Sequence, residues 1–175
     1  MKRTSKGFWL IVTAQAAFLL GWAGYHEVVR QNAPVILLKG RPVDPRDLLR
    51  GDYMTIGYDI SSVSVGDFRS KEGVDGPTGS DVWVLLELRG GYHVVAKASR
   101  DRLEPGPGQV LVRGTSGRDG RRGGGAARID YGIERFFVPE GKGSPRFKDM
   151  DVEVSVSPAH RLYLKRVLLD GKVYP

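Results

Sequence analysis

The chain has 175 residues, which is enough for one domain and an appendage, and a formal net charge of +7. It contains no cysteine, which excludes disulfides, a thiol nucleophile and a cysteine-ligated zinc site. The excess charge is local. Residues 1–30 contribute +3 from four basic side chains and one acid, and residues 113–128 contribute +4 from five basic side chains and one acid. The rest of the chain is neutral overall, so the charge does not indicate a nucleic-acid-binding protein.

Residues 8–25, near the N-terminus, form an uncharged and mainly apolar segment with the sequence FWLIVTAQAAFLLGWAGY. As a helix it would be about 27 Å long, close to the roughly 30 Å of a hydrocarbon core. Trp9 near one end and Trp22 with Tyr25 near the other are typical of membrane interfaces. The basic residues at positions 2, 3 and 6 predict a cytoplasmic N-terminus, with residues 31–175 outside the cytoplasm.

Two alternatives to a membrane anchor are open. A cleaved signal peptide would place small residues at Gly21 and Ala23, but the apolar segment is longer than the roughly 7–15 residues of a signal core. A soluble helix would need a polar face, and Thr13 and Gln15 are too few to form one. We therefore predict a transmembrane anchor over residues 1–34, in contact with lipid through residues 8–25 of a bacterial inner membrane. Residues 35–175 are predicted to form one periplasmic or extracellular domain.

That domain is predicted to be all-β. Its many glycines and prolines favour turns between short strands, and several segments alternate between apolar and polar residues. We expect about eight strands in an antiparallel barrel or sandwich. They are predicted at residues 35–39, 53–60, 82–88, 92–98, 109–113, 129–138 (one or two strands), 151–157 and 161–169.

The stretch over residues 41–58, RPVDPRDLLRGDYMTIGY, combines a turn and a strand. Asp44 is a good N-cap for one helical turn at residues 45–50, and Gly51 can end that turn. The period then changes to two, so that Met54, Ile56, Tyr58 and Ile60 are expected to face a core. Asp52 and Tyr53 follow the turn and are either ordinary turn residues or a recognition or catalytic pair.

These residues resemble the signature of the GDYXXLXY family. The resemblance lies in Gly51, Asp52, Tyr53, Ile56 and Tyr58, with isoleucine in place of the usual leucine. A second stretch, YGIERFFVPEG at residues 131–141, is similar to a later block of that family. The resemblance implies a membrane-anchored protein of unknown function, of a kind often found beside polytopic membrane proteins. It supplies no catalytic residues.

No complete catalytic or metal-binding motif is present in the sequence. The three histidines, His26, His93 and His160, are far apart and have no metal-ligand spacing, and no cofactor motif is found. A serine–lysine hydrolase could use Lys97 as its base, but residues 31–39 offer no serine nucleophile. A carboxylate pair of the glycoside-hydrolase kind needs two acids within about 5–10 Å, which the sequence cannot measure. The candidates are Asp52, Asp59, Glu134 and Glu140.

Two features could bind a partner. Arg118, Arg121 and Arg122 lie in a glycine-rich loop and could grip phosphates or carboxylates, although a solvated loop is the alternative. Glu134 and Glu140 in the second block are further candidate binding residues. An aromatic group is either core or a docking patch, namely Tyr131, Phe136, Phe137 and Phe147.

The sequence thus predicts a non-enzymatic accessory subunit that binds a polytopic membrane protein. The alternatives are an exported hydrolase acting on envelope polymers and a binder of anions or lipid headgroups through the arginine- and glycine-rich loop.

Overall fold

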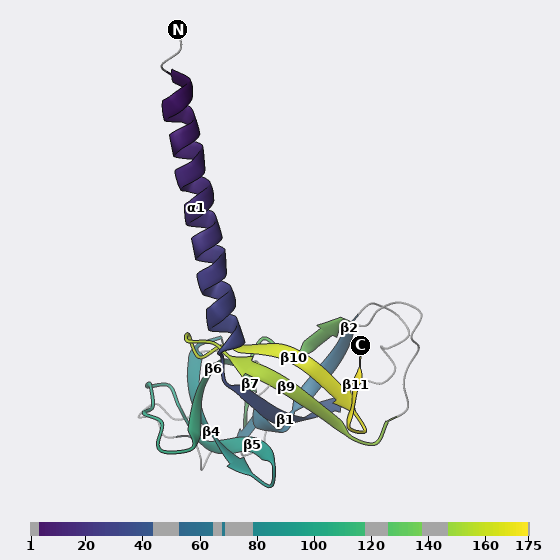
Figure 1. The fold of residues 1–175 in the computed structure, drawn as a ribbon. Coiled ribbons are helices and arrows are strands. Elements are labelled where there is room, and N and C mark those ends of the chain that lie inside the picture. Colours follow the sequence, from purple (N-terminus) through teal and green to yellow (C-terminus); the bar gives the residue numbers. More distant parts are fainter. Residues whose placement is uncertain are drawn as a thin grey trace. The chain divides into compact units, whose positions relative to one another are not determined.

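The computed structural model describes residues 4–43, 53–64, 68, 79–117, 126–137 and 147–174. The chain divides into two compact units, Met1–Ala33 and Pro34–Pro175. The first unit holds one helix, α1 (Thr4–Gln31), and the second is built of strands (Figure 1). The predicted helical turn at residues 45–50 lies outside the described residues.

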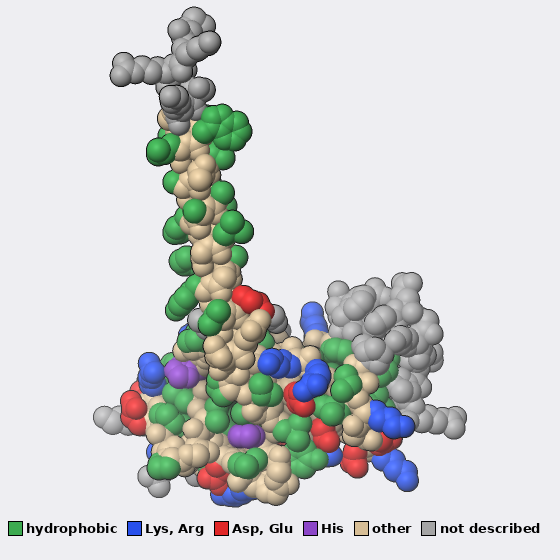
Figure 2. Space-filling model, viewed as in Figure 1, with side chains coloured by type: hydrophobic (Ala, Val, Ile, Leu, Met, Phe, Trp, Pro, Cys, Tyr) green, Lys and Arg blue, Asp and Glu red, His purple; other side chains and the backbone are tan. Residues whose placement is uncertain are grey.

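Helix α1 is apolar over most of its length. Its segment Gly7–Val28 is long and apolar enough to cross a membrane, and none of it is buried in the structure. Apolar side chains project from the helix on all the sides in view (Figure 2). The helix ends at Gln31, three residues before Pro34, which disfavours the helical conformation in the residue preceding it.

The first sheet has six antiparallel strands in the order β11-β10-β9-β1-β2-β8. Strand β1 lies in the middle, pairing with β9 from Val35↔Ser155 to Gly40↔Met150 and with β2 from Gly40↔Tyr58 to Pro42↔Ile56. The strand bounds are β1 (Val35–Pro42), β2 (Tyr53–Tyr58), β8 (Arg135–Phe137), β9 (Met150–Val156), β10 (Leu162–Leu169) and β11 (Lys172–Tyr174).

The second sheet has five antiparallel strands in the order β3-β7-β6-β4-β5. Its β4–β5 hairpin turns at Gly90 and Gly91, both with positive φ, and joins the two strands that the sequence predicts at residues 82–88 and 92–98. The strand bounds are β3 (Ser62–Ser64), β4 (Asp81–Arg89), β5 (Tyr92–Ser99), β6 (Gln109–Ser116) and β7 (Ala126–Asp130). Both sheets contribute to one core, in which Leu38, Val84 and Val152 are fully buried.

The mainly β, antiparallel sandwich-like fold is therefore confirmed, with eleven strands in the described part of the chain rather than about eight. The additional strands are short. Strands β3, β8 and β11 have three residues each, too few for an alternating pattern to show in the sequence. The prediction of one strand over residues 53–60 is wrong at its end, because a 3₁₀ turn, η2 (Asp59–Ser61), follows Tyr58 and leads into β3.

Buried and exposed side chains do not alternate strictly along β10. A register shift between Leu164 and Arg166 inserts an extra residue, so that Leu162 and Val167 are both buried although they lie five positions apart. The chain turns between β10 and β11 at Asp170 and Gly171, whose φ angles are 48° and 77°. The Asp170 carboxylate accepts hydrogen bonds from the backbone N–H groups of Asp149 and Lys148, which lower its pKa below the ordinary aspartate value.

The sequence predicts a strand that ends at residue 113, but β6 continues through Gly114 to Ser116, and no larger residue fits at Gly114. A Cβ added at Gly114 would lie 2.5 Å from Ile129 Cγ2 and 3.0 Å from the Asp130 carbonyl oxygen. We expect Gly114→Ala to lower the free energy of unfolding by roughly 1–2 kcal/mol, because overpacking outweighs the entropy gained from removing a glycine. Denaturant titration of the full chain in mild detergent measures this change. Gly106→Ala, in an exposed turn where only the Gln109 side chain comes near, is the control and should be almost neutral.

Candidate functional site

The two family-like blocks of the sequence meet at one corner of the β domain. Strand β2 belongs to the first sheet and β3 to the second, and η2 carries the chain between them. The chain returns from β7 to β8 through residues 131–134, at the same corner, since β2 pairs with β8 and β3 with β7. Residues 53–64 and 126–137 therefore form a two-stranded ribbon that passes from one sheet to the other, and we call its bend the motif corner.

Two buried tyrosines stabilise the motif corner, and each donates a hydrogen bond to a backbone carbonyl of the other segment. The hydroxyl of Tyr58 donates to the Ile133 carbonyl at 2.8 Å, and the hydroxyl of Tyr131 donates to the Ile60 carbonyl at 2.9 Å. Tyr58 is fully buried and Tyr131 nearly so. Burial raises the pKa of both phenols well above its ordinary value, and the nearby charge of Glu134 adds to this effect.

The inward face of β2 agrees with the predicted one at the positions whose side chains are described, which do not include Met54. Ile56 and Tyr58 are fully buried, and Ile60 in η2 is buried as well. The backbone N–H of Ile56 also donates to the Glu134 carbonyl at 2.7 Å, which continues the pairing of β2 beyond β8. Isoleucine at the motif's leucine position thus serves as a core residue. Only the backbone of Tyr53 is described, and it pairs with Phe137.

Glu134 lies half-buried in the bend between β7 and β8. One of its carboxylate oxygens accepts a hydrogen bond from the backbone N–H of Tyr131. This bond closes the bend, in which Gly132 has a φ of 81°. Glu134 therefore has a structural role at the motif corner, and the remaining acceptor capacity of its carboxylate is available for a ligand or partner.

A hollow of about 310 Å³ opens beside this corner. Its wall combines the motif residues Ile56 and Tyr58 with Glu134 and two exposed arginines, Arg41 from β1 and Arg128 from β7. Arg128 Nε lies 3.2 Å from Asp130 Oδ1. Such a surface combines a carboxylate acceptor with two guanidinium donors, which suits the polar side chains of a protein partner or a small charged ligand. We call it the motif hollow.

Several predicted site residues lie outside the part of the chain that the structure describes. They are Gly51, Asp52, Arg118, Arg121, Arg122 and Glu140. Of the four candidate acids, the structure describes Asp59, which is exposed in η2, and Glu134 at the motif corner. Within the described parts of the chain, no group of three or more histidine or acidic side chains could hold a metal ion.

The remaining predicted residues are dispersed. His93 lies in β5, where burial lowers its pKa, and His160 lies in the turn between β9 and β10. Tyr131 is buried, and Phe136 and Phe147 are partly buried against the core, so these three do not form the exposed docking patch that was one alternative for the aromatic group. The side chain of Phe137 is not among those described.

One ion-pair cluster cannot be predicted from the sequence, because it joins side chains from the separate strands β1, β5 and β9. Lys39 Nζ on β1 lies 2.9 Å from Asp151 Oδ1 and 3.3 Å from Asp149 Oδ1, and 5.0 Å from the centre of the Tyr92 ring on β5. The hydrogen bond to Asp151, followed by those to Asp149 and Tyr92, raises the pKa of Lys39. The cluster links the two sheets, and neither periodicity nor spacing could indicate it.

Comparison of the sequence with known protein families agrees with the motif. A family model described as GDYXXLXY protein matches residues 15–167. No curated protein and no solved structure matches the chain. The matched region contains both halves of the motif corner and almost the whole β domain. The chain belongs to the GDYXXLXY family.

Proposed function

We propose that this protein is anchored in the bacterial inner membrane by α1 and acts outside the cytoplasm as a binding subunit of a polytopic membrane protein. The observation that carries the proposal is the apolar surface of Gly7–Val28, a segment long and apolar enough to cross a membrane. Exposed on it are large side chains such as Trp9, Leu10 and Leu20, each more than half exposed. Exposing this apolar surface to water would be unfavourable in free energy, so we expect the helix to be surrounded by lipid or by another membrane protein.

The length and charge of the helix support this orientation. Twenty-two residues extend about 33 Å as a helix, enough for a hydrocarbon core of about 30 Å. The basic residues at positions 2, 3 and 6 favour a cytoplasmic N-terminus under the positive-inside rule. The β domain then lies on the other side of the membrane.

The motif hollow supports binding as the domain's activity. The described family residues are engaged in holding the corner: Tyr58 donates to Ile133, and Ile56 is core. The polar groups around the hollow, Arg41, Arg128 and Glu134, are suited to recognising a charged surface. We expect the motif hollow to contact a polytopic membrane protein, because both the family resemblance and the apolar helix α1 favour such a partner.

Purification of the tagged full chain from native membranes in mild detergent tests this proposal. We expect one polytopic membrane protein to be recovered in a stoichiometric amount. Arg41→Gln with Arg128→Gln should weaken its recovery severalfold, because two exposed charge contacts worth roughly 0.5–1 kcal/mol each would be lost. Arg89→Gln with Lys172→Gln, which removes the same charge from other exposed positions, is the matched control and should leave recovery unchanged.

Recovery of the protein alone, with no partner cross-linked to it in intact membranes, would contradict the proposed role as a subunit. Recovery unaffected by the arginine changes would keep the partner but move its contact away from the motif hollow.

A further inference from the structure

The apolar segment of α1 carries one amide side chain near its middle, that of Gln15. The midpoint of Gly7–Val28 lies between residues 17 and 18, so Gln15 is about 4 Å from that level along the helix axis. Gly7, the nearer end of the segment, is about 12 Å away along the axis. A glutamine side chain is much shorter than this distance. When the segment spans a membrane, the Gln15 amide therefore lies within the hydrocarbon core.

This amide has no hydrogen-bond partner in the described part of the chain. Gln15 is exposed, and its side chain takes part in no hydrogen bond there. An amide that enters an apolar medium without a partner loses the hydrogen bonds that water supplied, at a large cost in free energy. Thr13, the other polar residue near the middle, differs, because a threonine hydroxyl can bond the backbone carbonyl four residues earlier in its own helix. Gln15 thus needs a partner from another helix at the same depth.

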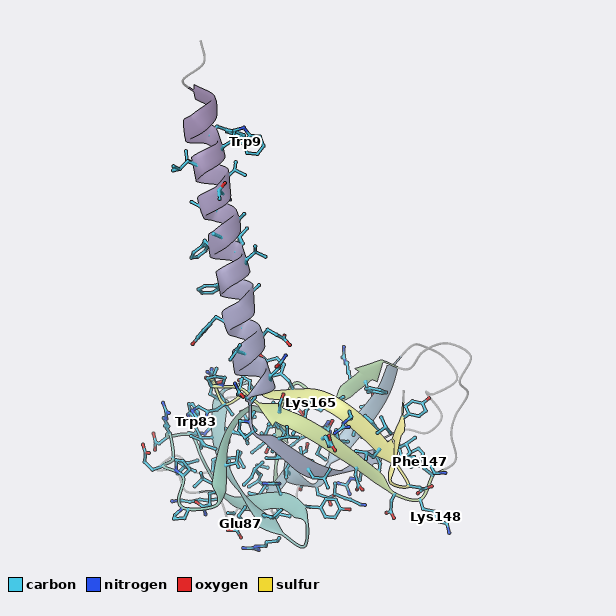
Figure 3. The ribbon with its side chains drawn as sticks, in the orientation of Figure 1. Trp9, Trp83, Glu87, Phe147, Lys148 and Lys165 are labelled. Atoms are coloured by element: carbon cyan, nitrogen blue, oxygen red, sulfur yellow. The ribbon has the colours of Figure 1, made fainter. Side chains whose placement is uncertain are left out.

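Large apolar side chains surround Gln15 on its side of the helix. Residues three, four and seven positions from it lie on the same side of an α-helix. All of these neighbours are large, apolar and exposed, and side chains project from α1 along its length in Figure 3, where Trp9 marks its first turns. We call Gln15 and these neighbours the Gln15 face, which adds Phe8, Ile11, Val12, Phe18, Leu19 and Trp22.

A second copy of this chain supplies the partner that Gln15 needs. The basic residues before the segment give every copy the same orientation, so the α1 helices of two copies are parallel, and in register both Gln15 residues lie at one depth. A carboxamide has donor N–H groups and an acceptor oxygen, so each amide can donate to the other. Gln15 then occupies an a position of a parallel helix pair, with Ile11 and Phe18 at the neighbouring d positions. One polar residue at such a position fixes the register of the two helices.

We propose that α1 pairs with α1 of a second copy through the Gln15 face, with the two Gln15 amides bonded to each other inside the membrane. The inference rests on the anchoring proposed above and goes beyond the role as a subunit. It uses residues of α1 alone, whereas the contact proposed for the polytopic partner is the motif hollow of the β domain. The large side chains of the two faces pack around the amides, and this packing acts together with the interhelical hydrogen bonds. A polar group on a helix of another membrane protein is the alternative occupant, and it predicts no pairing of this protein on its own.

Cysteine cross-linking of the full chain tests which side of α1 forms the pair, because the chain has no cysteine of its own. Phe18→Cys places a thiol on the Gln15 face. Leu20→Cys places one at almost the same depth but about 140° from Gln15 around the helix. Each variant is reconstituted into phosphatidylcholine vesicles, flotation establishes insertion, and disulfide formation between copies is measured on non-reducing gels after mild oxidation. We expect a cross-linked dimer from Phe18→Cys and a severalfold lower yield from Leu20→Cys.

Substitutions at Gln15 test the amide itself. Full chains labelled with donor or acceptor dyes at Lys172→Cys, an exposed position, are mixed in vesicles, and energy transfer is measured as a function of the protein-to-lipid ratio. Gln15→Leu should weaken the association roughly threefold to thirtyfold, the range for one side chain that hydrogen-bonds between helices. It cannot act by weakening the anchor, because leucine makes the segment more apolar. Gln15→Asn keeps an amide and should retain most of the association. Thr13→Val removes a polar group from another side of the helix and is the control, which should associate as the wild type does.

A protein that inserts but stays monomeric at every protein-to-lipid ratio rejects the pairing while leaving the anchor intact. Association that Gln15→Leu does not weaken, or equal cross-linking of Phe18→Cys and Leu20→Cys, rejects the Gln15 face as the contact. Recovery of a polytopic protein from native membranes should be unchanged in Gln15→Leu. If that recovery is lost and the purified protein does not pair, the amide belongs to the polytopic partner and the pairing is overturned. A protein that fails to float with the vesicles rejects the anchor, and the helix pair with it.

Discussion

Tyr58→Phe should lower the free energy of unfolding by about 1–3 kcal/mol, because it leaves the buried Ile133 carbonyl without its hydrogen bond. Tyr131→Phe should have a similar effect through the Ile60 carbonyl. This is a large fraction of the roughly 5–15 kcal/mol that stabilises a typical domain. Denaturant titration of the full chain in mild detergent measures both changes.

Tyr163→Phe is the matched control for these substitutions. Tyr163 is 57% exposed on β10, and loss of its hydroxyl should change stability by less than about 0.5 kcal/mol. If Tyr58→Phe were as neutral as this control, the hydroxyl of the motif tyrosine would have no part in holding the corner. The double variant should cost less than the sum of the two single changes if both bonds stabilise one cooperative bend.

Alkaline pH should unfold the β domain, because the two corner tyrosines must stay protonated while it is folded. Burial raises the pKa of Tyr58 and Tyr131 above the ordinary value near 10, so the folded state keeps protons that the unfolded chain loses. Their contribution is fully present below about pH 10 and is lost as the pH rises. Each tyrosine then costs about 1.4 kcal/mol for every further pH unit. Lys39, whose pKa is also raised, adds to the same slope.

The comparison of wild type with Tyr58→Phe isolates the tyrosine effect from that of Lys39. The stability advantage of the wild type should be constant below about pH 10 and should shrink above it, since phenylalanine has no proton to lose. Absorbance of tyrosinate during the same titration should show a late component that appears together with unfolding and is reduced in either single variant. A wild-type advantage that stays constant through alkaline pH would show that Tyr58 ionises freely in the folded state.

The motif illustrates what the local pattern could and could not predict. Alternation over residues 53–60 predicts an inward face, and Ile56, Tyr58 and Ile60 are buried as expected. The same alternation cannot show that the chain changes sheets after Tyr58, because the break is a three-residue 3₁₀ turn whose central Ile60 keeps the apolar rhythm. The partner of the Tyr58 hydroxyl lies 75 positions away in sequence, at a backbone carbonyl that carries no sequence signal.

The apolar helix, the mainly β domain, most strand positions and the family could all be predicted from the sequence, because periodicity, turn residues and a motif are local properties of the chain. The order of the strands in each sheet and the backbone carbonyls that accept from the Tyr58 and Tyr131 hydroxyls are known only from the folded structure. These contacts join residues from different strands, and the sequence does not contain the pairing order that brings them together. The motif marks a corner of the fold, and the motif hollow beside that corner exists only once both sheets have formed.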